Sequence, residues 1–305
     1  MSHSLRTTAL LLLGTTVAGA QAAVGRTDET WTARERLESG QRLHVASPNG
    51  AITITQGSGR DVEIRGVKRA DRGGSIEEMA FKIVRSPEGL VVCAVYEDDD
   101  RCTLEDGYRR ARRNDRGGWN HRTRASFTVQ VPAGVQVEAN TGNGEISVNG
   151  AGNDVRANSG NGKILISGTD GRVTANTGNG EVIVEGARGE VDVSTGNGNV
   201  RVSTSTGPVN ANSGNGDIII SMERVSRAAD MKFSTGNGEI VLSVPTDFGA
   251  ELDASTGSGR ITTHLPMRIQ GRIDPHSVRG TLGNGGGRLS LRSGNGDIEV
   301  RSAQR

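Results

Sequence analysis

The chain has 305 residues, of which 45 are Gly, 7 are Pro and only 2 Trp, 2 Tyr and 4 Phe are aromatic. Glycine at about twice its usual frequency without matching proline excludes collagen, and two Cys exclude a disulfide-dense scaffold. With 36 basic and 35 acidic residues the formal net charge is +1. The chain therefore has no general field that would attract nucleic acid or an anionic membrane.

The first 22 residues have the pattern of a secretory signal peptide. A weakly basic start at Arg6 precedes an apolar segment centred on Leu10-Leu11-Leu12-Leu13, and Ala20-Gln21-Ala22 matches a cleavage site. No later apolar stretch reaches the ~18 residues of a membrane span. We therefore expect an exported protein, periplasmic or at the cell surface or outside the cell, with no transmembrane span in the mature chain.

A repeat centred on Gly-Asn-Gly dominates the rest of the sequence. Around each triplet the pattern is apolar-x-small-x-Ser/Thr-Gly-Asn-Gly-x-apolar-x-apolar, so each side of the triplet predicts a short strand with one buried face. A Gly-Ser-Gly triplet at Gly257 is a variant of the same unit. The Gly-Asn-Gly triplets that fit this pattern begin, at first every 18 residues, at Gly142, Gly160, Gly178, Gly196 and Gly214, and then at Gly236 and Gly294.

Equal spacing favours an all-β fold, a parallel β-solenoid with coils of about 18 residues and two strands each. One unit buries too little apolar surface to offset the entropy of ordering it, so units must stack and pair with their neighbours. The triplet asparagines would then lie in register as a structural amide ladder. The competing interpretation is a run of antiparallel hairpins, because Asn-Gly is also a hairpin signal. The predicted ladder comprises Asn143, Asn161, Asn179, Asn197 and Asn215.

The predicted organisation has three parts. Residues 1–22 are the signal peptide, residues 23–133 form irregular N-terminal strands that begin the solenoid, and residues 134–305 form its regular part. A charged insertion, 97–124, interrupts the N-terminal region. Segments 221–230 and 265–288 are expected as loops expelled from the stack. The open ends need capping, for which the N-terminal strands and Arg301 to Arg305 are candidates.

The charged insertion carries the binding candidates. Basic and aromatic side chains alternate in it, which suits a polyanion, although nearby acidic residues favour a plain solvated loop. The hypothesis assigns polyanion binding to Arg109, Arg110, Arg112, Arg113 and Trp119. Because an exported chain meets an oxidising compartment, Cys93 and Cys102, nine positions apart, are expected to form a disulfide.

The sequence predicts no catalytic residue, no metal site and no cofactor. Asp274, His276 and Ser277 are adjacent in the sequence, but adjacency is not triad geometry. The acids after the triplets do not match the calcium-binding nonapeptide, because position 163 is Lys and position 199 is Asn. No apolar pocket that would raise a carboxyl pKa for glycosidase chemistry is evident in the pattern.

The segment Val137 to Val148, with its reiterations and the lead-in Val131-Pro132-Ala133-Gly134, resembles the bacterial putative-adhesin family of β-strand-repeat proteins, a domain of unknown function. The resemblance covers about residues 40–300, implies a β-solenoid and an adhesin, and supplies no catalytic residues to transfer to this chain. We therefore expect a non-enzymatic, exported cell-envelope protein, an adhesin or structural module. Its expected partner is an envelope glycan or a surface protein, and not a specific nucleic acid. The alternatives are a self-assembling envelope scaffold and a polysaccharide-active β-helix enzyme.

Overall fold

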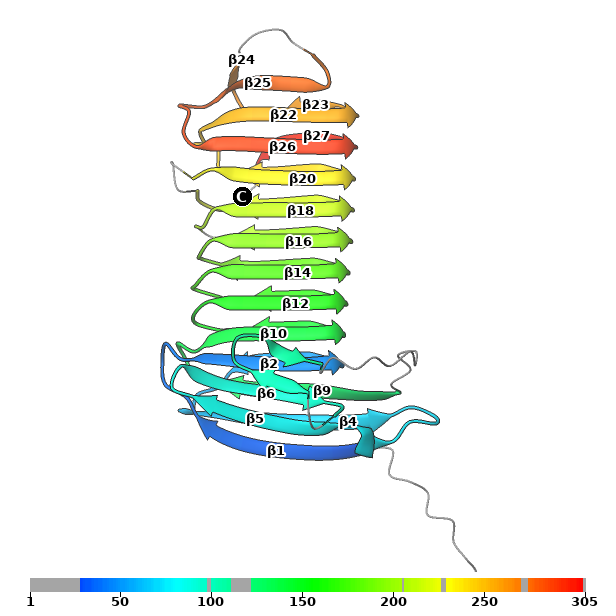
Figure 1. The fold of residues 1–305 in the computed structure, drawn as a ribbon. Coiled ribbons are helices and arrows are strands. Elements are labelled where there is room, and N and C mark those ends of the chain that lie inside the picture. The colour runs from blue at the N-terminus through cyan, green and yellow to red at the C-terminus, as the bar shows by residue number, and fades with distance from the viewer. Residues whose placement is uncertain are drawn as a thin grey trace, which may run out of the picture.

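The computed structural model describes residues 28–97, 100–110, 122–204, 206–225, 229–269 and 274–303. Two long sheets face each other and form one column (Figure 1). Within these residues, sheet A has 12 strands and sheet B has 13, and a third sheet has two short strands. Within the described residues no helix is long and apolar enough to cross a membrane.

The regular coils alternate between the two sheets. Each coil places one strand in sheet B, turns at the Gly-Asn-Gly triplet, and places the next strand in sheet A. The sheet B strands are β10 (Gln136–Asn143), β12 (Val155–Asn161), β14 (Val173–Asn179), β16 (Val191–Asn197), β18 (Val209–Asn215) and β20 (Met231–Asn237). The sheet A strands are β11 (Ile146–Asn149), β13 (Ile164–Ser167), β15 (Val182–Ala187), β17 (Val200–Thr204), β19 (Ile218–Met222) and β21 (Ile240–Val244).

Every pair of neighbouring regular strands is parallel and in the register set by the repeat. Val155 lies opposite Val173, and Asn161 lies opposite Asn179. This pairing confirms the β-solenoid and excludes a hairpin meander for the regular coils. The side chains of the regular coils alternate between inward and outward positions. Four inward ones, Val155 and Ala157 from sheet B and Ile164 and Ile166 from sheet A, are at most 2% exposed.

The triplet glycines allow the corners of adjacent coils to approach closely. A Cβ added to Gly216, whose φ is +146°, would lie 2.2 Å from the carbonyl oxygen of Gly198 in the preceding coil. That distance is far below van der Waals contact, so the corner has no room for a side chain. The fixed position of Gly in the repeat is therefore a requirement of stacking.

The N-terminal region forms the first coils and closes that end of the column. β2 and β3 make a coil like the regular ones, β6 and β9 extend it by parallel pairing, and β1, β4 and β5 add antiparallel strands that form the cap. Trp31 stacks on Phe81 there, with ring centroids 5.1 Å apart. The elements are β1 (Asp28–Arg36), β2 (Arg42–Asn49), β3 (Ile52–Gln56), β4 (Asp61–Ala70), the 3-10 helix η1 (Ile76–Glu78), β5 (Ala80–Ser86), β6 (Gly89–Val95), β7 (Arg101–Thr103), β8 (Gly107–Arg109) and β9 (Thr123–Val131).

The C-terminal end does not stack in chain order. The last coil, β26 and β27, lies between the coil of β20 and β21 and the coil of β22 and β23, so the final segment fills a layer that the chain passed over earlier (Figure 1). The strands are β22 (Ala250–Ser258), β23 (Ile261–Thr263), β24 (Met267–Ile269), β25 (Ser277–Leu282), β26 (Arg288–Asn295) and β27 (Ile298–Ser302).

Two sequence expectations for this end are wrong. Segment 265–288 is not simply an expelled loop, because β25 pairs antiparallel with β22 and β24 pairs with β25, and together they cap sheet B. Arg301 does not cap the column either, because it lies in β27 with a paired strand on each side. These cap strands lack the Ser/Thr-Gly-Asn-Gly corner of the repeat, and antiparallel pairing does not need the repeat spacing.

Candidate functional site

The outer face of sheet B carries a row of amide side chains. Residues between the inward positions of a strand face outward, which places Asn140, Asn158 and Asn176 above one another on successive coils. Asn158 Nδ2 donates to Asn140 Oδ1 over 2.8 Å, and Asn176 Nδ2 donates to Asn158 Oδ1 over 3.1 Å. The row therefore presents a directed chain of amides that ends at Asn176.

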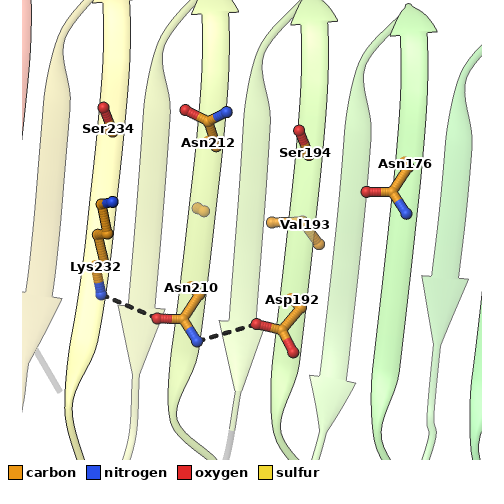
Figure 2. Close-up of a pocket in the computed structure, with 9 residues that line it drawn as sticks. Asn176, Asp192, Val193, Ser194, Asn210, Asn212, Lys232 and Ser234 are labelled. Carbon is orange, nitrogen blue, oxygen red and sulfur yellow. Dashed lines mark hydrogen bonds between the residues drawn. The ribbon is translucent and has the colours of Figure 1, made fainter.

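A shallow hollow begins where this row ends. The next coil has Ser194 in place of asparagine, and the coils beyond have Asn212 and Ser234. Figure 2 shows the shorter side chains of Ser194 and Ser234 alternating with the amides of Asn176 and Asn212 on neighbouring strands. The hollow has a volume of about 360 Å³. Among the described residues, the side chains of Ser194, Asn212 and Ser234 make no hydrogen bond, so their donors and acceptors are available to a ligand.

A second row runs along the same strands and forms one wall of the hollow. Asn210 Nδ2 donates to the Asp192 carboxylate over 3.0 Å, and the backbone N–H of Lys232 donates to Asn210 Oδ1 over 3.0 Å (Figure 2). The hollow, which we call the sheet B hollow, therefore combines amides, hydroxyls, one carboxylate and one ammonium group. Such a surface can exchange hydrogen bonds with a hydroxyl-rich ligand.

The residues that the structure describes include no group of three His, Cys, Asp or Glu side chains arranged to hold a metal ion. Asp274 and His276 are joined locally, since the backbone N–H of His276 donates to Asp274 Oδ1 over 2.8 Å. The His276 ring contacts the carbonyl oxygen of Gly259 through Nδ1 at 2.9 Å. This arrangement is a turn.

At its N-terminal end the amide row meets a buried histidine that sequence reasoning missed. His44 in β2 points outward but is fully covered by the hairpin of β7 and β8. Its Nδ1 lies 2.9 Å from the carbonyl oxygen of Leu104, and its Nε2 lies 2.6 Å from Asn140 Nδ2. Since a carbonyl only accepts and an amide nitrogen only donates, the ring is neutral with its proton on Nδ1. Burial lowers the pKa of His44, against the opposing effects of the Leu104 carbonyl and the Glu138 carboxylate.

The hairpin over His44 is the ordered part of the charged insertion. Cys93 and Cys102 form a disulfide with their Cα atoms 5.9 Å apart, which ties β7 to the outer face of β6. Val91, Val95 and Leu104 complete a small second core around it. The signal for this cover was present in the uninterrupted apolar run Leu90 to Val95, because a strand that is apolar on both faces is buried on both faces.

The acidic end of the insertion has a structural role at Asp100. Its carboxylate accepts the backbone N–H groups of Tyr96 and Glu97 at 3.1 and 3.2 Å, and the residue is 4% exposed. Tyr96 donates its hydroxyl to the carbonyl oxygen of Thr123, and burial raises the pKa of Tyr96 to about 12. Burial and the nearby Asp100 carboxylate raise the pKa of Tyr108 as well.

The residues assigned to polyanion binding are only partly described. Arg109 pairs with Asp106 at 3.2 Å, and Arg110 pairs with Glu97 at 3.9 Å, so acids of the same insertion offset both cations. Arg112, Arg113 and Trp119 lie outside the described residues. Polyanion binding by this loop stays a prediction, which replacing the four arginines by serine and measuring retention on heparin would test.

The triplet asparagines form a continuous ladder along the corner of the column. Asn143 accepts at one end of the ladder. Each later Nδ2 donates to the Oδ1 of the asparagine in the neighbouring coil at 2.7–2.9 Å, from Asn161 through Asn215 and on to Asn237 and Asn295. Inside the corner runs a second, buried row. The hydroxyl before each triplet donates to a carbonyl oxygen of an adjacent coil at 2.8–3.0 Å in Ser47, Thr141, Ser159, Thr177, Thr195, Ser213, Thr235, Thr256 and Ser293.

A family model described as Toastrack DUF4097 matches residues 41–301, which is most of the chain. The chain belongs to the Toastrack DUF4097 family. Membership of this family confirms the resemblance that the triplet repeat indicated. The column of two parallel sheets described above is the architecture of this Toastrack chain. Among curated proteins, none is similar enough to this Toastrack chain to count as a match.

Solved structures that resemble this Toastrack chain include three bacterial proteins with low sequence identity. A putative cell adhesion protein from Clostridium sporogenes is 10% identical, with 90% of this chain and 100% of that chain covered and a TM-score of 0.32. A putative adhesin from Parabacteroides distasonis is 10% identical, with 89% and 97% covered and a TM-score of 0.45. A putative adhesin from Bacteroides fragilis is 11% identical, with 90% and 97% covered and a TM-score of 0.36.

Proposed function

We propose that the protein is exported to the cell envelope and acts there as a non-enzymatic adhesive module that binds a hydroxyl-rich glycan on the outer face of sheet B. The sheet B hollow is the observation that carries this proposal. Ser194, Asn212 and Ser234 offer uncommitted donors and acceptors on rigid parallel strands, about 4.8 Å apart from coil to coil. Because the strands already hold these polar groups in place, the groups lose little conformational entropy on binding. This favours an extended ligand that makes many weak contacts.

The charges of the hollow favour a glycan over the other ligand classes. Asp192 and Lys232 face the same hollow, so their opposite charges favour neither a polyanion nor a polycation. A peptide that adds a strand needs a free sheet edge, and the hollow lies on the face of sheet B. Sugar hydroxyls, which both donate and accept, satisfy amides and hydroxyls equally well.

A substitution that completes the amide row tests the proposal without loss of folding. Ser194→Asn should join Asn176 to Asn212 and fill the hollow, because asparagine already occupies this position in neighbouring coils. Titration calorimetry with chito-oligosaccharides and dextran should show binding by the full mature chain and at least a tenfold loss in the variant. The matched control is Ser203→Asn, on the outer face of sheet A. Absence of binding, or equal binding by both variants, would overturn the glycan site.

Two further measurements address the location and the absence of catalysis. Fractionation and protease treatment of intact cells should place the chain in the envelope, and recovery in the cytoplasm would contradict export. Incubation with the same polysaccharides should release no reducing ends. Release that is lost in Asp192→Asn would instead support the enzyme alternative.

A further inference from the structure

The layer that holds the last coil is bounded on both sides by strands that precede it in the chain. β26 pairs with β20 on one side and β22 on the other, while β27 pairs with β21 and β23. Within the described residues β22 pairs otherwise only with β25, and β23 has no other partner, so the last coil joins these outer strands to the rest of the column. Before it enters, β20 and β21 on one side and β22 and β23 on the other have unpaired backbone groups, the kind of edge that accepts a strand from another chain. We call the layer between these two edges the slot.

The last coil fills this slot with the same contacts as every regular coil. Leu289, Leu291, Ile298 and Val300 are fully buried. Asn295 Nδ2 donates to Asn237 Oδ1 at 2.7 Å, and the backbone N–H of Gly296 donates to the carbonyl oxygen of Ser258 at 2.8 Å. Segment 288–302 fills the slot, and every copy of the chain carries that segment.

The connection to this segment is a glycine-rich linker. Residues 283–287 read Gly-Asn-Gly-Gly-Gly, and Gly283, Gly285 and Gly286 have φ values of +53°, +77° and +155°. The linker carries the chain from β25, on one side of β22, to β26 on the other. A linker of this composition has little conformational preference, so it does not dictate which copy of the slot the coil enters.

We propose that the C-terminal coil, residues 288–302, is an exchangeable element that enters the slot of a second copy of this chain and thereby joins two molecules. The contacts formed are the same in both cases, so the balance depends on chain concentration and on the linker. Reciprocal exchange gives a closed dimer. This association leaves both ends capped, and it is independent of the proposed glycan site.

Engineered cysteine pairs in the full mature chain distinguish the two placements. Ser234→Cys with Arg292→Cys joins β20 to β26, and Lys232→Cys with Ser290→Cys is a second pair in the same two strands. Isotopically heavy and light chains are unfolded, mixed, refolded at two concentrations and oxidised, and the linked peptides are identified by mass. Heavy–light links report exchange. In a 1:1 mixture exchange also gives an equal number of same-isotope links, so only the excess of same-isotope links counts as intrachain links and reports closure.

We expect the ratio of heavy–light to intrachain links to rise about tenfold for a tenfold rise in concentration. The matched control, Ser194→Cys with Asn212→Cys, joins β16 to β18, which are consecutive in the stack and lie before the linker, and its ratio should stay low and constant. Deleting Gly285 to Gly287 should raise the heavy–light fraction severalfold, because a short linker hinders return past β22. Heavy–light links no more frequent than in the control would overturn the proposal. Failure of both β20–β26 pairs to link in any way would also overturn it, because β26 would then not lie in the slot.

Discussion

Asn179 donates its Nδ2 hydrogen to Asn161 Oδ1 across 2.7 Å, although 18 residues separate them in the chain. Asn197 donates to Asn179 in the same way at 2.8 Å. Each interior amide is therefore donor to one neighbour and acceptor from the other, and the aligned dipoles reinforce one another. The ladder therefore links each coil to the next through side-chain hydrogen bonds, in addition to the backbone hydrogen bonds of the sheets.

An interior asparagine of this ladder should contribute more to the free energy of unfolding than a terminal one. Asn179→Ala removes two side-chain bonds, and Asn143→Ala removes the single bond from Asn161. We expect losses in the free energy of unfolding of about 1–2 kcal/mol and about half that, respectively, because each exposed bond contributes roughly 1 kcal/mol or less. Urea denaturation measures both, and equal losses would contradict the ladder as an energetic unit.

In the buried hydroxyl row, the free energy of unfolding should depend strongly on a single hydroxyl oxygen. Thr177 donates to the carbonyl oxygen of Gly162 at 3.0 Å from inside the corner. Thr177→Val keeps the shape but leaves that buried carbonyl unpaired, which should cost about 1–3 kcal/mol. The same exchange at Thr174, outward-facing in the same strand β14, should change the unfolding free energy by less than about 0.5 kcal/mol. Similar values for the two variants would refute the role of the hydroxyl.

The repeat made the column predictable because its spacing and its period of two are local and redundant. Val155, Ala157, Ile164 and Ile166 each have an equivalent in the next coil, so many positions gave the same register. The order of the last coils was not predictable, because Leu289 to Val300 fits any layer equally well. In the structure β25 occupies the outer edge of β22, and the last coil lies between β20 and β22.

The candidate site was harder to predict than the fold. The sheet B hollow arises because Ser194 interrupts a row of asparagines, a difference visible only after the outward positions of three strands are aligned in space. His44 was missed because its cover comes from Leu104, 60 residues later. The apolar run at β6 indicated two-sided burial, but it did not identify what covers the outer face.

The corner glycines should not tolerate even a methyl group. A Cβ on Gly216 would lie 2.2 Å from the Gly198 carbonyl oxygen, and the residue has positive φ. Gly216→Ala should therefore cost about 2–4 kcal/mol through crowding and backbone strain. Gly152→Ala is the control, because the nearest atom to its added Cβ is 3.6 Å away. Denaturant midpoints that shift equally for the two variants would contradict this account.

A fall in pH should release the hairpin of β7 and β8 from the outer face of sheet B. The pKa of His44 is lowered in the folded state by burial, beside Glu138, Arg42 and Asp106. The open state binds the proton more readily, so the docked hairpin is fully stable above the ordinary histidine pKa of about 6.5 and loses stability as the pH falls below it. The hydrogen-exchange protection factors of the β7 and β8 amides, which are corrected for the intrinsic effect of pH, should fall in that range. His44→Gln, which does not titrate there, should remove the dependence, and an unchanged pH profile in this variant would exclude His44 as its source.

Reduction of the disulfide should loosen the same hairpin and leave the column intact. Cys93 and Cys102 are nine positions apart and close a short loop, so the cross-link contributes about 2.5 kcal/mol by restricting the open chain. The cluster that it anchors is separate from the main core, which is continuous through the coils. Cys93→Ala with Cys102→Ala should therefore increase exchange in β7 and β8 and leave β12 to β21 protected. Equal loosening of hairpin and column would show instead that the cover supports the whole solenoid.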